Sequence, residues 1–109
     1  MYNYKIIVEY DGTNFVGWQQ QENGKSIQAV LQDALFKLSG EKVTIFGAGR
    51  TDAGVHAYGQ VASFTINKKI ETDVIRDGLN QHLRPHPISV QKAELVDSKF
   101  HARFSAIKR

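Results

Sequence analysis

The run SIQAVLQDALFKLSG, residues 26–40, carries the clearest helical pattern in the chain. Ser26 is a favourable helix N-cap, and Gly40 stands where a helix commonly ends in a left-handed residue. The apolar residues between them follow the i, i+3, i+4, i+7, i+8 spacing of a single stripe: Ile27, Val30, Leu31, Ala34, Leu35 and Leu38. The segment therefore predicts an amphipathic helix that buries one face.

Strand patterns lie on both sides of this helix. Residues 4–10 alternate and are rich in β-branched and aromatic side chains, which predicts a first strand. After the helix, residues 43–46 predict a second strand and residues 61–66 a third. A fourth strand is predicted over residues 88–96, and residues 100–108 are expected to begin another.

A second helix is predicted between the third and fourth strands. Thr72 or Asp73 is expected to cap it, and Pro85 to end it; its apolar residues are Val74, Ile75, Leu79 and Leu83. The resulting order, β-α-β-β-α-β, is typical of the ferredoxin-like α+β fold. We therefore expect an antiparallel sheet with two helices on one face.

Composition excludes several classes of protein. The 109 residues are 41% hydrophobic and 23% charged, which is typical of one globular domain. The absence of cysteine excludes a disulfide scaffold, a cysteine nucleophile and a thiolate metal site. No apolar run could span a membrane and no secretory signal is present, so we expect an intracellular, cytoplasmic domain. The net charge of +3 permits a nucleic-acid partner without requiring one.

The most informative segment for function is GAGRTDAGVHA, residues 47–57. Arg50 and Asp52 lie two residues apart between glycines, and a guanidinium keeps a nearby carboxylate ionised. This arrangement suits a carboxylate nucleophile or base, and equally an arginine that grips phosphate. A structural turn is an equal alternative, with Asp52 bonded to local backbone and Arg50 in solvent. Dinucleotide and phosphate-loop motifs do not fit, because the third glycine and the Gly-Lys-Ser/Thr ending are missing.

Two further segments combine aromatic and polar residues. In YDGTNFVGWQQQ, residues 10–21, Phe15 and Trp18 either stack on a nucleic-acid base or fold back as a lid on the core. The lid is the favoured interpretation for Trp18. In FHARFSAIKR, residues 100–109, the basic groups either meet phosphate or protect an edge strand: His101, Arg103, Lys108 and Arg109.

The histidines do not form a metal-binding pattern. His82 and His86 have helical i, i+4 spacing, but Pro85 lies between them and no glutamate completes a motif. We therefore expect no metal. A serine hydrolase has no support either, because Gly-x-Ser-x-Gly is absent.

Several of these segments together resemble the tRNA pseudouridine synthase A (TruA) family. The matching segments, in the order the family has them, are YDGTNFVGWQQQ, SIQAVLQDAL, GAGRTDAGVHAYGQVASF, LNQHL and FHARFSA followed by Lys108-Arg109. They cover nearly all of the chain, and the central motif is long and specific.

The resemblance implies a cofactor-free isomerase that detaches a uracil from its ribose, turns it and rejoins it through carbon. The implied substrate is uridine at positions 38–40 of the tRNA anticodon stem-loop. The family's essential aspartate falls on Asp52, and the arginine of its motif on Arg50. Whether Asp52 attacks covalently as a nucleophile or abstracts a proton stays open. The basic residues of the last segment (His101, Arg103, Lys108 and Arg109) are candidate tRNA contacts by charge rather than by motif.

The resemblance also implies features that residues 1–109 do not contain. Family members are about twice as long, so this chain is expected to be their amino-terminal catalytic domain without the carboxy-terminal domain. The family works as a homodimer, and its two domains form an RNA-binding cleft. Its active-site tyrosine is expected shortly after Arg109. The chain alone is therefore expected to fold, to bind tRNA weakly and not to turn over. Arg84 before Pro85 is a smaller departure that lengthens a turn.

Two alternatives remain at this point. A non-catalytic ferredoxin-like RNA-binding module would need stacking aromatics on its central strands, and residues 59–64 match that pattern poorly. It would also leave Asp52 without a task. A structural or dimerisation domain is the second alternative, and salt-sensitive binding of tRNA would argue against it.

Overall fold

The fold was analysed in a computed structural model that describes residues 1–13, 15–18, 24–49, 54, 56–97 and 99–100. The elements in chain order are β1 (Tyr2–Tyr10), α1 (Ile27–Ser39), β2 (Phe46–Gly47), β3 (Ala57–Ile66), α2 (Thr72–Leu83) and β4 (Ile88–Val96). This order confirms the predicted β-α-β-β-α-β arrangement. None of the helices in the described part of the chain has the length and apolar character needed to cross a membrane.

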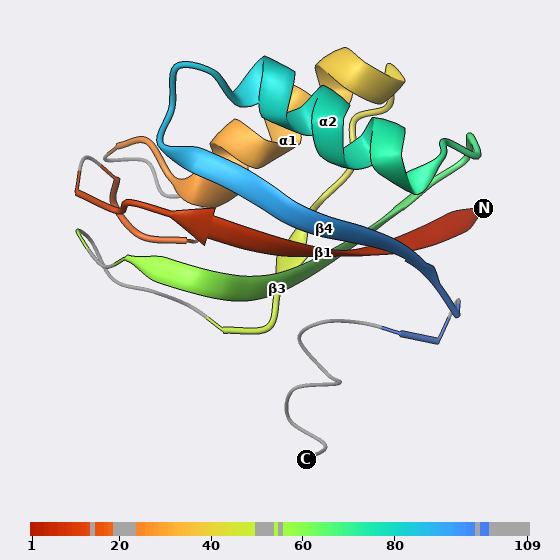
Figure 1. The fold of residues 1–109 in the computed structure, drawn as a ribbon, viewed down its shortest axis with the longest axis horizontal. Coiled ribbons are helices and arrows are strands. Elements are labelled where there is room, and N and C mark those ends of the chain that lie inside the picture. The colour runs from red at the N-terminus through yellow and green to blue at the C-terminus, as the bar shows by residue number, and fades with distance from the viewer. Residues whose placement is uncertain (14, 19–23, 50–53, 55, 98, 101–109) are drawn as a thin grey trace.

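The strands form one antiparallel sheet in the order β2-β3-β1-β4. Both helices lie over the same face of that sheet (Figure 1). This is the layer arrangement of a ferredoxin-like α+β fold, as the sequence predicts. Since β1 is paired on both sides, by β3 and by β4, its end is held firmly, and the loop that follows it starts from a fixed point.

The core lies between the helices and the sheet. Alternate residues of β1 face it, namely Tyr4, Ile6, Val8 and Tyr10, and all four are buried. The apolar stripe predicted for the first helix is confirmed: Leu31 and Leu35 are fully buried. Both predicted ends of that helix are also confirmed. The Ser26 side chain accepts a hydrogen bond from Ala29 N, and Gly40 ends the helix with φ 76°.

The second strand is shorter than predicted. Residues 43–46 were expected to pair, yet sheet pairing covers only Phe46–Gly47. The backbone of Ile45 is bonded by α1 instead: Ile45 N donates to Gln32 Oε1 at 3.0 Å, and Gln28 Nε2 donates to Ile45 O at 3.0 Å. These glutamine side chains bond the backbone N–H and C=O of Ile45, which would otherwise be available to a neighbouring strand. The third strand is longer than predicted, beginning at Ala57 rather than at residue 61.

The predicted cap of the second helix is wrong, whereas its end is right. Glu71 occupies the N-cap position without a side-chain cap bond, so neither Thr72 nor Asp73 is the cap. Asp73 lies in the first turn, where its charge favours the positive end of the helix dipole. Leu83 is the last helical residue because a residue that precedes proline, here Arg84, is disfavoured in helical geometry. The strand expected over residues 100–108 falls almost entirely outside the described residues.

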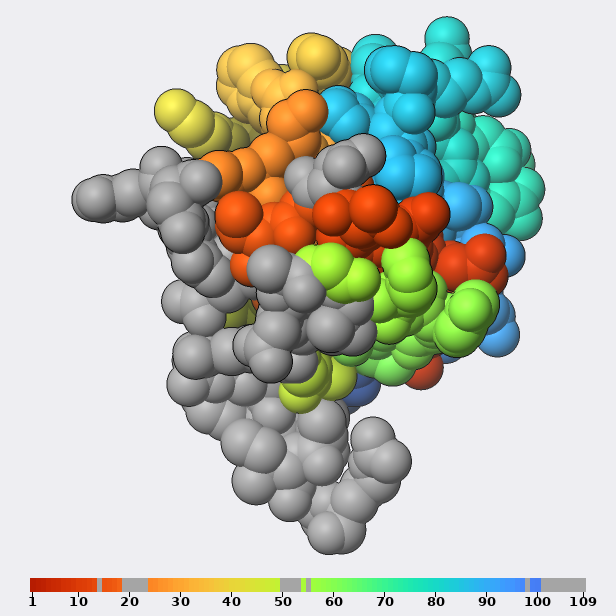
Figure 2. Space-filling model, turned by 90° about the vertical axis from the view of Figure 1, so that its left-hand side faces the viewer, coloured from red at the N-terminus to blue at the C-terminus, as the bar shows by residue number. Residues whose placement is uncertain are grey.

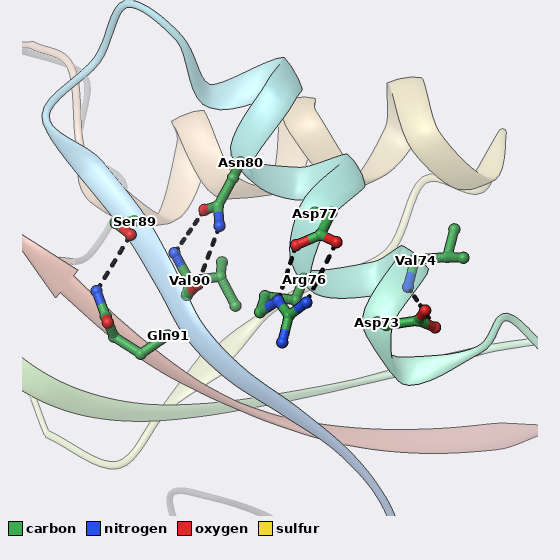
Figure 3. Close-up of polar contacts among 8 residues, drawn as sticks. All are labelled: Asp73, Val74, Arg76, Asp77, Asn80, Ser89, Val90 and Gln91. Atoms are coloured by element: carbon green, nitrogen blue, oxygen red, sulfur yellow. Dashed lines mark hydrogen bonds and ion pairs between the residues drawn. The ribbon is translucent and has the colours of Figure 1, made fainter.

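A side-chain clamp joins α2 to the edge strand β4 (Figure 3). Asn80 Nδ2 donates to Val90 O at 3.0 Å, and Val90 N donates to Asn80 Oδ1 at 2.7 Å. The amide thus takes the place of a further strand at this position, which is one way to protect a sheet edge from pairing with another chain.

Candidate functional site

The predicted catalytic residues belong to the loop between β2 and β3. Arg50 and Asp52 themselves lie outside the described residues, as do the candidate tRNA contacts His101, Arg103, Lys108 and Arg109. The structure does describe both ends of the loop, residues 47–49 and then Gly54 and His56. The site is therefore defined by what holds these two ends.

The first end of the loop is bonded to β3 and packed against Trp18. Ala48 N donates to Val61 O at 2.8 Å, and Gln60 Nε2 donates to Gly49 O. A Cβ added to Gly47 would lie 2.7 Å from Trp18 Cε2, which is closer than carbon atoms can approach. Glycine is therefore required at residue 47 because the indole ring lies directly against its backbone.

Replacing Gly47 with alanine is expected to displace the Trp18 ring. The ring is only 3% exposed, so overpacking should lower the free energy of unfolding by about 1–3 kcal/mol. Urea unfolding followed by tryptophan fluorescence measures the effect. Gly59→Ala is a suitable control, because its nearest contact would be an ordinary 3.9 Å. Equal midpoints for the two variants would contradict the close packing.

The second end of the loop is bonded to the segment that follows β1. Gly54 has φ 79°, a left-handed conformation that favours glycine, and its N–H donates to Phe15 O at 3.2 Å. His56 Nδ1 lies 3.0 Å from Gly12 N and 3.1 Å from Asp11 Oδ1. Both ends of the Asp52 loop are thus fastened to residues 11–18.

The described residues of this segment, 11–13 and 15–18, are held by hydrogen bonds at both ends. Asp11 N donates to Pro87 O at 3.0 Å, which ties the turn after β1 to the start of β4. At the other side, Gly17 O and Trp18 O accept from Ile27 N and Gln28 N, two N–H groups at the start of α1 that have no partner inside the helix. The segment therefore bridges β4 and α1 and provides a rigid base for the loop.

The two aromatic residues of this segment are parts of the core. Phe15 is 4% exposed and Trp18 is 3% exposed; the Trp18 ring lies 6.4 Å from the Tyr10 ring, centroid to centroid. The interpretation of Trp18 as a lid on the core is confirmed, and stacking of either ring on a base is wrong for this structure. The physical reason is that large aromatic rings gain free energy when they are buried in the core rather than left exposed on a polar loop.

An open hollow of about 540 Å³ lies beside the second end of the loop. Its lining includes Asp11, His56, His86 and Tyr58, and the Tyr58 side chain is strongly exposed. Figure 2 faces the end of the molecule where residues 9–13, 56–60 and 84–89 come together (orange-red, green and blue). Among the described residues, those that line the hollow include no lysine or arginine, and they offer hydrogen bonds and ring surfaces.

Asp11 is ionised at neutral pH. Hydrogen bonds from the Thr13 side chain and backbone N–H hold the pKa of Asp11 below its usual value, and nearby His56 lowers it further. A depressed carboxyl pKa contributes stability above the unfolded-state pKa, and this contribution is lost as the pH falls through the folded-state pKa. The turn should therefore keep its geometry throughout the neutral range. In the described part of the chain, no three metal-ligating side chains come together.

A comparison with known protein families shows the family to which this chain belongs. A model described as tRNA pseudouridine synthase matches residues 6–105. The chain belongs to the tRNA pseudouridine synthase family. This confirms the resemblance expected from the sequence motifs.

Curated relatives agree with the family. The chain is 58% identical over 109 residues to a tRNA pseudouridine synthase A of Afipia carboxidovorans, covering 100% of this chain and 44% of that protein. It is 52% identical to the Parvibaculum lavamentivorans protein over the same shares. It is 55% identical to the Ehrlichia ruminantium protein, over 97% of this chain and 44% of the relative. The chain thus spans less than half the length of these synthases.

The sequence pattern did not reveal what anchors the loop. Neither local pattern nor motif spacing assigns Asp11, Gly12 or His56 a shared role. The partners Gly12 and His56 lie 44 residues apart, so no local periodicity connects them. The available signal was weaker: polar residues directly after β1 and directly before β3, two strands that are neighbours in the predicted sheet.

Proposed function

We propose that residues 1–109 are the amino-terminal catalytic domain of a tRNA pseudouridine synthase that isomerises uridine at positions 38–40 of the anticodon stem-loop. The observation that carries the proposal is the anchoring of the Asp52 loop at both ends. A reacting group must be held close to its productive geometry, and two fixed ends restrict where a short loop can place its carboxylate. A merely structural turn has no need of such support.

In this function Asp52 is the reacting carboxylate and Arg50 supports it. The target base is stacked in the anticodon arm, so the enzyme must turn it out at a cost of a few kcal/mol. Contacts of basic groups with the tRNA backbone offset that cost, and His101, Arg103, Lys108 and Arg109 are the residues proposed for them. Asp52 then acts while the uracil is detached from its ribose, turned and rejoined through carbon. No cofactor takes part.

The remaining parts of the proposal concern the full-length protein. It has a carboxy-terminal half that completes the cleft and supplies the aromatic partner of Asp52. It works as a homodimer in the cytoplasm. The support for the second half is that the chain covers only 44% of the length of relatives that share its sequence from end to end.

The central strands carry no aromatic ring at the paired positions of the face turned away from the helices, where β1 presents Lys5 and Ile7, and β3 presents Val61, Ser63 and Thr65. Exposed rings lie at the margins of this face: Phe46, which pairs with Ser63, is 39% exposed, and the Phe100 ring centroid lies 5.8 Å from Lys5 Nζ. A stacking-type RNA-binding module is therefore the second candidate function, and its bases would have to stack on these marginal rings.

Pseudouridine formation in a tRNA transcript tests the proposal. The full-length protein should modify the anticodon arm, whereas residues 1–109 alone should bind tRNA weakly, with affinity falling as salt rises, and make no product. Tight binding without modification by the full-length protein would favour the RNA-binding module. Efficient modification by residues 1–109 alone would show that the second half is not needed for the reaction.

A further inference from the structure

We propose that His56 is a positioning residue for the reaction: it fastens the end of the Asp52 loop to the turn that follows β1. The inference rests on the proposed function, because it concerns where the Asp52 carboxylate is held. The proposed function gives this side chain no other task. His56 is not a catalytic residue in this proposal, since it acts through the loop.

The geometry gives the imidazole two partners on one turn. Nδ1 of His56 lies 3.0 Å from Gly12 N and 3.1 Å from Asp11 Oδ1. A single ring nitrogen cannot accept and donate at once. Without a proton, Nδ1 accepts from Gly12 N–H; with a proton, it donates to the Asp11 carboxylate. Because both partners belong to the same turn, the link survives a change of protonation.

The turn that contains Asp11 and Gly12 is itself held in place by other hydrogen bonds. Asp11 N is bonded to Pro87 O, and Asp11 Oδ1 accepts from Thr13 N at 2.9 Å. His56 follows Asp52 by four residues, and Gly54 between them is bonded to Phe15 O. The two described residues at this end, Gly54 and His56, are therefore each tied to the segment that follows β1. If the His56 link is lost, Gly54 keeps its bond to Phe15 O and Ala57 keeps its pairing with Tyr10, but the side-chain tie between the loop and the turn after β1 is gone.

A purely structural role of His56 would affect the stability of the fold rather than the reaction rate. The His56 and Asp11 side chains are 47% and 57% exposed, and ion pairs this exposed contribute little to folding. Positioning, by contrast, acts on the rate, because a misplacement of about 1 Å can cost about 100-fold. The proposal therefore places the effect of His56 on kcat, with little change in stability or in tRNA affinity.

Two substitutions of His56 in the full-length protein test this. His56→Ala removes the link and should lower kcat for pseudouridine formation by about 10–100-fold, with KM within about threefold. His56→Asn keeps an acceptor at the position of Nδ1 and should restore kcat to within about threefold of the wild type. Single-turnover rates measure the chemical step, and filter retention measures the affinity for tRNA.

Asn80→Ala is the matched control. It removes two hydrogen bonds between α2 and β4, away from the loop, so it should destabilise the fold more than His56→Ala does. If positioning is the cause, Asn80→Ala keeps kcat while His56→Ala loses it. If the two variants lose kcat in step with their stability, or if His56→Asn is as slow as His56→Ala, the proposal is overturned.

Amide hydrogen exchange separates this inference from the proposed function. His56→Ala should speed the exchange of Gly12 N–H by about fivefold, and His56→Asn should not. A wild-type protein that makes no pseudouridine would contradict the proposed function, and with it any role in placing Asp52. Unchanged exchange at Gly12 in His56→Ala would overturn the link itself, whatever the activity.

Discussion

Replacing Asp52 with asparagine is expected to abolish pseudouridine formation by the full-length protein, lowering the rate by at least about 10²–10⁴-fold. The substitution keeps the size of the side chain and its ability to form hydrogen bonds, but removes the negative charge. An amide can neither attack as a nucleophile nor take up a proton at neutral pH. Binding of tRNA should stay within about threefold, because the basic contacts are unchanged. Nucleoside analysis of the treated tRNA measures the product.

Asp33→Asn is the matched control for this experiment. Asp33 lies on the exposed face of α1, 3.1 Å from Lys37 Nζ, and belongs to no part of the site. It loses the same charge, and it should keep full activity. Equal activity of Asp52→Asn and Asp33→Asn would show that Asp52 is only a turn residue, and the reacting group would have to be sought elsewhere. Loss of tRNA binding together with activity in Asp52→Asn would mean that the aspartate shapes the binding surface.

Trp18→Ala is expected to have the largest effect on stability, lowering the free energy of unfolding by about 3–5 kcal/mol. The indole packs between the Tyr10 ring and the backbone of Gly47, so its removal leaves a cavity between the last residue of β1 and the last residue of β2. The same cavity releases the first end of the Asp52 loop. We therefore expect a loss of activity beyond what the unfolded fraction explains. Urea unfolding followed by circular dichroism gives the stability.

Two further variants make the Trp18 result interpretable. Val74→Ala shortens an apolar side chain that is 47% exposed on α2, and should change stability by less than about 1 kcal/mol. Trp18→Phe keeps an apolar ring and should fall between the other two. An unfolding midpoint of Trp18→Ala that matches Val74→Ala would show that the ring does not support the core or the loop.

The first helix shows how far local sequence can be trusted here. The Ser26 cap, the buried stripe through Leu31 and Leu35, and the left-handed Gly40 were all predicted and are all observed. Each of these signals acts within one or two helical turns, so the residues that carry it are close together in the chain. The order of the elements followed from such signals, and the ferredoxin-like fold followed from the order.

The strand error occurred where distant residues compete for the same backbone groups. Residues 43–46 read as a strand by composition, but Gln28 and Gln32 of α1 occupy the backbone of Ile45. The cap of α2 differs from the predicted one by one or two residues: Glu71 holds the N-cap position, and Thr72 is the first helical residue. The strand error cannot be avoided from propensity, because it depends on where α1 lies.

For the candidate site, the sequence by itself determined the motif, the family and the residue proposed to react. Those depend on residue types in a fixed order, and Arg50 and Asp52 can be identified from the printed chain. Only the tertiary structure decided what holds the loop: Trp18 against Gly47 at one end, and Gly12 against His56 at the other. Such contacts join segments about thirty to forty-four residues apart, and they form only when the β1–β3 pairing brings the two loops to the same end of the sheet.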